Sequence, residues 1–262
     1  MSAAIAFAGR LWRGLEFLLA LAVVGLLWHL AALWVGKRNV LPSPAAVASA
    51  WLELLADNLP SDALASLAHL CAGYGAGVAT GLLLAVACAR FAVVEAAVDP
   101  LIELLRPIGA IAWIPLAILM FGIGTGVPIF LIFYASTFPV FVNTLAGIRH
   151  VDRRLVQAAE MLGASRRMIV THVVVPAALP LILSGARLSL GVAWASMVAA
   201  ELTGADAGLG WRIFWYQEFF AMDRVMAVIL TIGVLGYLLD LALRFLQRRL
   251  TRWSPDSETE AR

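Results

Sequence analysis

Few side chains in this sequence of 262 residues are of a type and spacing suited to catalysis. No nucleophile with a base, no pair of carboxylates and no H-E-x-x-H motif is apparent. A phosphate-binding loop is missing too, because the only lysine, Lys37, follows no Gly-rich segment. No segment holds histidines at the spacing of metal ligands, and we expect unrelated surface or interfacial side chains at His29, His69, His150 and His172. We therefore expect neither an enzyme active site nor a metal.

Ionisable residues within the apolar runs lie near the ends of those runs, namely Glu103, Arg106, Arg187, Glu201 and Asp240. A carrier coupled to protons or ions usually needs such groups near the middle of the membrane. Their position argues against a secondary carrier. The net charge of +2 is too small to indicate a nucleic-acid partner.

One polar segment, 157–176 (QAAEMLGASRRMIVTHVVVP), has a pattern suited to binding another protein. Asp152 can cap a first helix, which Gly163 ends. Ser165 can cap a second helix, and we expect Pro176 and Pro180 to break the chain before the next apolar run. The first helix carries apolar or small residues at i, i+3, i+4 and i+7, which are Leu155, Ala158, Ala159 and Leu162.

Two interpretations of this insert are open. As an ordinary loop, its arginines would hold it against anionic lipid. As a docking element, its short apolar helix would be covered by a partner protein, because a lone helix of this length is marginal in water. The apolar face favours docking.

The elements that position the insert are membrane helices. The sequence is 62% hydrophobic and only 14% charged, with a mean hydropathy of +0.90, which is typical of a membrane protein. Six segments can cross a hydrocarbon core of about 30 Å, at about 20 residues each; they are 17–35, 64–89, 100–121, 127–148, 181–202 and 225–246. The first resembles a signal peptide, but its apolar core is too long for one.

The basic residues predict the orientation. With both termini in the cytoplasm, only four of the 19 lysines and arginines lie outside, which are Lys37, Arg38, Arg212 and Arg224. Outside, a short interfacial helix should begin near Ser43 with Pro44 in its first turn. The glycines at 73, 77 and 81 predict close packing of the second span against another helix.

The insert resembles the EAA loop of ABC transporter permeases, the membrane subunits of binding-protein-dependent importers. That pattern is Glu-Ala-Ala, three residues, Gly, nine residues and Ile-x-Leu-Pro. This chain has Gln157-Ala158-Ala159, then Gly163, then 173–176 (VVVP), at the same spacing. Further segments, including LPSPAAV, LRPIGAIAWIPLAILMFGIG and AELTGADAGLGW, are similar to the nitrate, sulfonate and taurine branch, which also holds bicarbonate, vitamin-precursor and aromatic-acid permeases.

The resemblance implies an all-α, polytopic type I importer permease of six transmembrane helices in a bacterial inner membrane. Residues 1–63 would hold the first span and the outer amphipathic segment, 64–248 the permease core with a coupling loop at 149–180, and 249–262 the cytoplasmic tail. Partners would be two ABC ATPase subunits, which bind ATP and Mg²⁺, a second permease copy, a soluble solute-binding protein and lipid. The residues implied to contact the ATPase are Gln157, Ala158, Ala159, Glu160, Leu162, Gly163 and Ala164.

The implied function is ATP-driven import of a small anionic solute (sulfonate, taurine, nitrate or an organic acid) by alternating access. The alternatives are a secondary carrier, a permease for a pyrimidine vitamin precursor, or a docking subunit that moves nothing. Polar or aromatic residues on spans three to five are candidates for the pathway, or else for helix packing; they are Trp113, Phe138, Asn143, Trp194, Ser196, Met197 and Glu201. Glu201 would gate the pathway, contribute to docking, or lie at a solvated helix end. Residues 210–220 (GWRIFWYQEFF) would touch the binding protein or form an interfacial aromatic belt.

Overall fold

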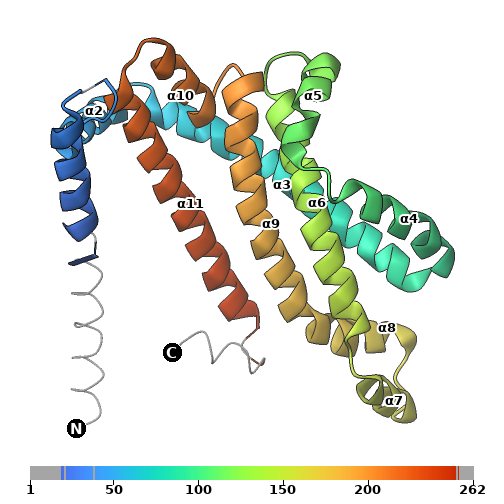
Figure 1. Cartoon of the computed structure of the whole chain (residues 1–262). Helices are drawn as coiled ribbons and strands as arrows, with labels where there is room; N and C mark the ends of the chain where they lie inside the picture. Colours follow the sequence, from blue (N-terminus) through green and yellow to red (C-terminus); the bar gives the residue numbers. More distant parts are fainter. Residues whose placement is uncertain (1–18, 21, 38, 252, 254–262) are drawn as a thin grey trace, which may run out of the picture. The chain divides into compact units, whose positions relative to one another are not determined.

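The computed structural model describes residues 19–20, 22–37, 39–251 and 253, and every regular element in these ranges is helical (Figure 1). An apolar helix at Ala22–Val35 comes first. It is followed by α2 (Pro44–Leu55), α3 (Leu59–Arg90), α4 (Ala92–Leu105), η1 (Ala110–Trp113), α5 (Ile114–Phe121), α6 (Gly126–Arg149), α7 (Arg153–Met161), α8 (Arg166–Ile169), η2 (Val170–Val174), α9 (Val175–Gly204), α10 (Leu209–Glu218) and α11 (Met222–Leu250).

The chain forms two compact units, and the smaller one comprises Met1–Pro60 and Ile213–Thr231. Within it, α2 begins as the sequence predicts, with the Ser43 hydroxyl accepting a hydrogen bond from the Ala46 N–H and Pro44 in the first turn. The indole N–H of Trp51 donates to Thr231 Oγ1 at 3.0 Å, so α2 is tied to the start of α11.

Four helices in the described residues are long and apolar enough to cross a membrane, which are Leu59–Arg90, Gly126–Arg149, Arg166–Gly204 and Met222–Leu250. They contain the predicted segments 64–89, 127–148, 181–202 and 225–246. A bent pair of helices forms a candidate fifth span. The predicted first span, 17–35, begins outside the described residues, and its described part includes the short apolar helix Ala22–Val35. The count of six therefore stays a prediction.

The segment 100–121, predicted to span the membrane, is not one continuous helix in the structure and remains a candidate span only as part of a bent pair. The chain here forms two helical pieces, Ala92–Leu105 and Ala110–Phe121, which meet at 89°. Pro107 lacks a backbone N–H, and Gly109 adopts an extended conformation (φ −62°, ψ 144°), so the helix cannot continue. The Tyr134 hydroxyl of α6 donates to the Leu105 carbonyl at 2.7 Å and so satisfies one group that the break frees.

The larger unit, Ser61–Arg212 with Ile232–Arg262, is built around α6 and α9, which lie side by side (Figure 1). Glycines bring the two backbones close along their whole length. A Cβ added at Gly185 would lie 2.4 Å from Asn143 Cβ, and one at Gly204 would lie 2.7 Å from Val127 Cγ1. Near the insert, a Cβ at Gly147 would lie 3.1 Å from the Ala178 carbonyl oxygen. Such packing leaves little room for the two helices to slide independently.

The glycine stripe of α3 packs against α6, as the sequence predicts. We expect Gly77→Ala to destabilise the protein by about 1–3 kcal/mol, because its Cβ would lie 1.9 Å from Ser136 Oγ and 2.8 Å from the Phe133 carbonyl oxygen. The matched control is Gly75→Ala, whose Cβ meets no atom within 4 Å. Thermal unfolding in detergent measures both; equal melting temperatures for the two variants would show that this contact is not needed.

Candidate functional site

The insert lies between the end of α6 and the start of α9, and its first helix is α7 (Figure 1). The Asp152 carboxylate accepts a hydrogen bond from the Arg154 N–H at 2.8 Å and caps the helix. At the other end Gly163 has φ +77°, and its N–H donates to the Glu160 carbonyl. The predicted cap and the predicted stop are both confirmed, and they fix the length of α7.

The second helix of the insert begins as predicted, with Ser165 accepting from the Met168 N–H. The predicted break at Pro176 and Pro180 is wrong, because the helix runs on without interruption from Arg166 to Gly204. The π-helical turn η2 accounts for this: the Val175 N–H donates to the Val170 carbonyl, and Pro176, which has no N–H, follows directly. A local π turn of this kind lets a membrane helix tolerate proline. The insert is therefore continuous with a membrane span.

Large apolar side chains of α7 point away from the rest of the chain. We call Leu155 and Met161 of α7, with Leu162 directly after it, the apolar face; the last two are 84% and 88% exposed. Of the predicted contact residues, Gln157, Ala158 and Glu160 are also exposed, whereas Ala159 and Ala164 are half-buried. Ala159, Leu162, Gly163 and Ala164 line one cavity with Met168, Ile169, His172 and Val173, and its volume is about 480 Å³. An exposed apolar surface beside such a hollow is typical of a protein-binding site.

Exposed arginines surround the apolar face. Four arginines flank it and are exposed, and within the described residues no ion pair engages their side chains; they are Arg153, Arg154, Arg166 and Arg167. An apolar centre with a basic rim fits a partner groove that is apolar inside and acidic at its edge.

A second polar site lies near the C-terminal end of α9, where the Glu201 side chain is fully buried. Glu201 Oε2 accepts hydrogen bonds from the Ser66 hydroxyl (2.8 Å) and the Gly210 N–H (2.9 Å), and Oε1 lies 2.8 Å from His69 Nδ1. The Leu209 N–H donates to Ser66 Oγ at 2.8 Å. A carboxylate only accepts, so an ionised Glu201 requires the His69 proton on Nδ1. We call Ser66, His69 and Glu201 the buried latch.

The latch joins three helices. Ser66 and His69 lie on α3, Glu201 lies on α9, and the loop that enters α10 folds over the carboxylate. Gly208, at φ +111°, makes this approach possible, since a Cβ there would lie 2.5 Å from Glu201 Cδ. The interpretations of Glu201 as a solvated helix end and of His69 as a surface or interfacial side chain are therefore wrong. The detectable signal was a carboxylate near the end of an apolar run, which must find partners when it is buried.

The other pathway candidates pack in three separate clusters. Trp113 and Phe138 both contact the Tyr134 ring, with centroids 5.5 Å and 4.8 Å away. Met197 is fully buried and packs beside Trp194 in a second hydrophobic cluster. Ser196, on the same helix α9, is buried too. Asn143 Nδ2 donates to the Pro139 carbonyl within α6. All of these contacts lie within one chain, and a role of these residues in the pathway stays a prediction.

Comparison with known proteins yields one family and several close relatives. Residues 77–252 match the family described as binding-protein-dependent transport system inner membrane component. The chain is 39% identical over 232 residues to the taurine transport system permease protein TauC of Escherichia coli, covering 86% of this chain and 84% of that protein. It is 36% identical to the putative aliphatic sulfonates transport permease protein SsuC of Bacillus subtilis, covering 90% and 86%.

Solved structures agree on the fold. A chain of the MetNI methionine ABC transporter in inward-facing conformations superposes with a TM-score of 0.60. The alignment covers 72% of this chain and 94% of that one at 20% identity.

Proposed function

The chain belongs to the family of binding-protein-dependent transport system inner membrane components, the permease subunits of ABC importers, and we propose that it carries a small sulfonate such as taurine. The proposal for the solute rests on the relatives named for taurine and aliphatic sulfonates, each matched over most of both chains. As a permease subunit it hydrolyses no ATP, and a separate ATPase does so. ATP and Mg²⁺ would bind to that partner.

The apolar face of α7 is the contact with the ATPase. The observation that carries this assignment is the exposure of two large apolar side chains, Met161 and Leu162. They lie on the short segment that connects α6 to the continuous helix Arg166–Gly204. A groove on the ATPase would cover these side chains, and acidic residues at its edge would meet the arginines around them. Gln157 stands where the family pattern has glutamate, and it keeps the capacity to hydrogen-bond.

The mechanism follows from the stiffness of the helices. Closure of two ATPases on ATP would pull the α7 helices of two permease copies together. Because α6 and α9 pack closely from Gly147 to Gly204, they would move as one body. The buried latch would then carry the motion to α3 and to the loop before α10, opening the pathway toward the solute-binding protein.

The test is uptake by the purified permease and ATPase complex in vesicles with the binding protein. We expect taurine uptake that requires ATP, and a complex mass equal to two permeases and two ATPases. Nitrate and a hydroxymethylpyrimidine serve as competing solutes. Transport of either in preference to taurine would replace the sulfonate assignment, and uptake without the ATPase would indicate a secondary carrier.

Topology provides a separate prediction. Since most basic residues cluster on one side, we expect a reporter at Arg153 to be cytoplasmic and a reporter near Asn58 to be external. Both termini would be cytoplasmic. A cytoplasmic signal near Asn58 would contradict the six-span arrangement.

A further inference from the structure

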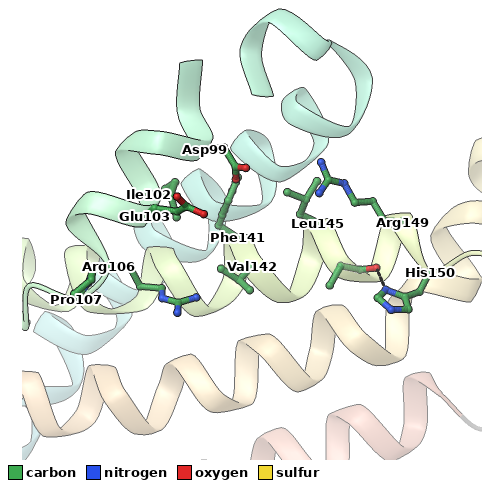
Figure 2. A pocket seen from close by; sticks show the side chains of 11 residues that line it. Asp99, Ile102, Glu103, Arg106, Pro107, Phe141, Val142, Leu145, Arg149 and His150 are labelled. Carbon is green, nitrogen blue, oxygen red and sulfur yellow. Dashed lines mark hydrogen bonds between the residues drawn. The ribbon is translucent and has the colours of Figure 1, made fainter. Parts of the chain in front are cut away.

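A cavity of about 420 Å³ lies between α4 and the last turns of α6, at the end of α6 that leads into the insert (Figure 2). This volume suits a small molecule. Its apolar lining includes Ile102, Phe141 and Leu145. Its charged lining comes from Asp99, Glu103, Arg106 and Arg149, with His150 beside them.

Two of these groups already have partners within the chain. Arg149 forms an ion pair with Glu95 of α4. His150 Nδ1 lies 2.7 Å from the Ala146 carbonyl oxygen of its own helix. Arg149 and His150 are therefore already paired, at the end of the cavity next to the insert. Figure 2 shows the contact that His150 makes.

The other three charges have no partner in the described part of the chain. Asp99 and Glu103 are one helical turn apart on α4, and no hydrogen bond or ion pair engages either carboxylate. Like charges at this spacing repel each other, so a cation between them would be favourable. Arg106 follows three residues after Glu103, and no ion pair engages its guanidinium either.

From this arrangement we infer that the cavity binds a small zwitterion, with an ammonium group at Asp99 and Glu103 and an oxyanion at Arg106. The apolar lining would contact the short carbon chain between the two charged ends. A simple anion fits less well because two carboxylates would repel it. A metal cation fits less well because Arg106 would repel it, and no group of three His, Cys, Asp or Glu suited to a metal occurs among the described residues.

Two sources could supply this chemistry. One is a free aminosulfonate such as taurine, and this source rests on the proposed function. The other is the phosphoethanolamine headgroup of phosphatidylethanolamine, which does not rest on it. In taurine two carbons separate the ammonium group from the sulfonate, and in phosphoethanolamine two carbons and an ester oxygen separate it from the phosphate.

The experiment uses the purified permease and ATPase complex. Equilibrium binding is measured for taurine and for 2-hydroxyethanesulfonate, in which a hydroxyl replaces the ammonium group. Mass spectrometry of the same complex identifies retained phosphatidylethanolamine and phosphatidylglycerol. The variants are Glu103→Gln and Arg106→Gln, and the control is Asp57→Asn, which removes an exposed carboxylate elsewhere.

Two results support the site. Either taurine binds at least tenfold more tightly than 2-hydroxyethanesulfonate, or phosphatidylethanolamine is retained and phosphatidylglycerol is not. In both cases each variant should weaken binding by about tenfold or more, because it removes a charged hydrogen-bonding partner, and the control should not. Co-purified ATPase confirms that the variants are assembled.

Three results overturn it: no zwitterion bound, no preference for the ammonium group, or variants that bind like the unaltered complex. The ligand preference of the unaltered complex is informative even where a variant fails to assemble. If the complex takes up no sulfonate but still binds a zwitterion through Arg106, the proposed function fails and this site stands.

Discussion

Leu162→Asp should leave the protein folded in the membrane and remove the ATPase from it. The side chain is 88% exposed, so the change costs the isolated chain little. In the complex it would place an unpaired charge in a tight apolar contact, which typically costs several kcal/mol. Each 1.4 kcal/mol is about a factor of ten in affinity, so docking should weaken more than a hundredfold.

The measurements are the amount of co-purified ATPase and the ATP hydrolysis that the binding protein stimulates. Val40→Asp is the matched control, because it puts the same charge in place of an apolar side chain that is 64% exposed. Retention of both signals in Leu162→Asp would show that α7 is not the docking element. Ala159→Asp and Gly163→Arg should act in the same direction, but Ala159 is half-buried and Gly163 has a positive φ, so folding effects would complicate them.

Gln157→Glu tests whether the position needs a charge. It restores the residue of the family pattern on an exposed position of the same helix. Activity should be kept or rise slightly, although the variant adds the same charge as Leu162→Asp five residues earlier. Loss of activity in both variants would mean that added negative charge alone disrupts docking, independently of the apolar face.

The sequence predicted the parts of this fold that depend on local patterns. Asp152, Ser165 and Gly163 define the helices of the insert through cap and stop chemistry that acts within a few residues. The glycine stripe of α3 also follows from spacing alone, since small residues four apart must share one face.

The structure departs from the sequence-based expectations where a local π turn or a distant contact overrides a local rule. Proline normally ends a helix, but η2 lets the chain pass Pro176. The apolar run over 100–121 looks continuous, but Pro107 and Gly109 divide it and Tyr134 stabilises the broken end. The buried latch pairs residues more than 130 positions apart, and a single sequence holds no sign of that pairing.

Because one helix connects the insert with the latch, we expect the latch to affect movement as well as stability. The helix Arg166–Gly204 starts within the insert, and Glu201 lies on its last turn. If α9 moves as a rigid rod, the carboxylate decides whether α3 and the loop before α10 follow it. A defect in the latch should therefore affect both stability and the response to the binding protein.

Glu201→Ala should have the largest effect on folding. It leaves the Ser66 hydroxyl, the Gly210 N–H and His69 without their acceptor in a site closed to water. Each such group costs about 1–3 kcal/mol, and removing one partner of a buried pair costs about 3–5 kcal/mol. Since this approaches the whole stability of many domains, we expect little monodisperse protein after detergent extraction.

Glu201→Gln separates the stabilising role of the latch from its mechanical role. The amide keeps the shape and one acceptor oxygen, but its NH₂ group would meet donors where Oε1 or Oε2 now accepts. The variant should fold with a lower melting temperature, and binding-protein-stimulated ATP hydrolysis should fall more than basal hydrolysis, because the loop before α10 would no longer follow α9. Glu218→Gln, which neutralises an exposed carboxylate on α10, is the control for removal of a charge.

If Glu201→Ala extracts and melts like the unaltered protein, the latch does not stabilise the fold. If Glu201→Gln loses stability while both hydrolysis rates keep their ratio, the latch holds the helices together without transmitting motion between them.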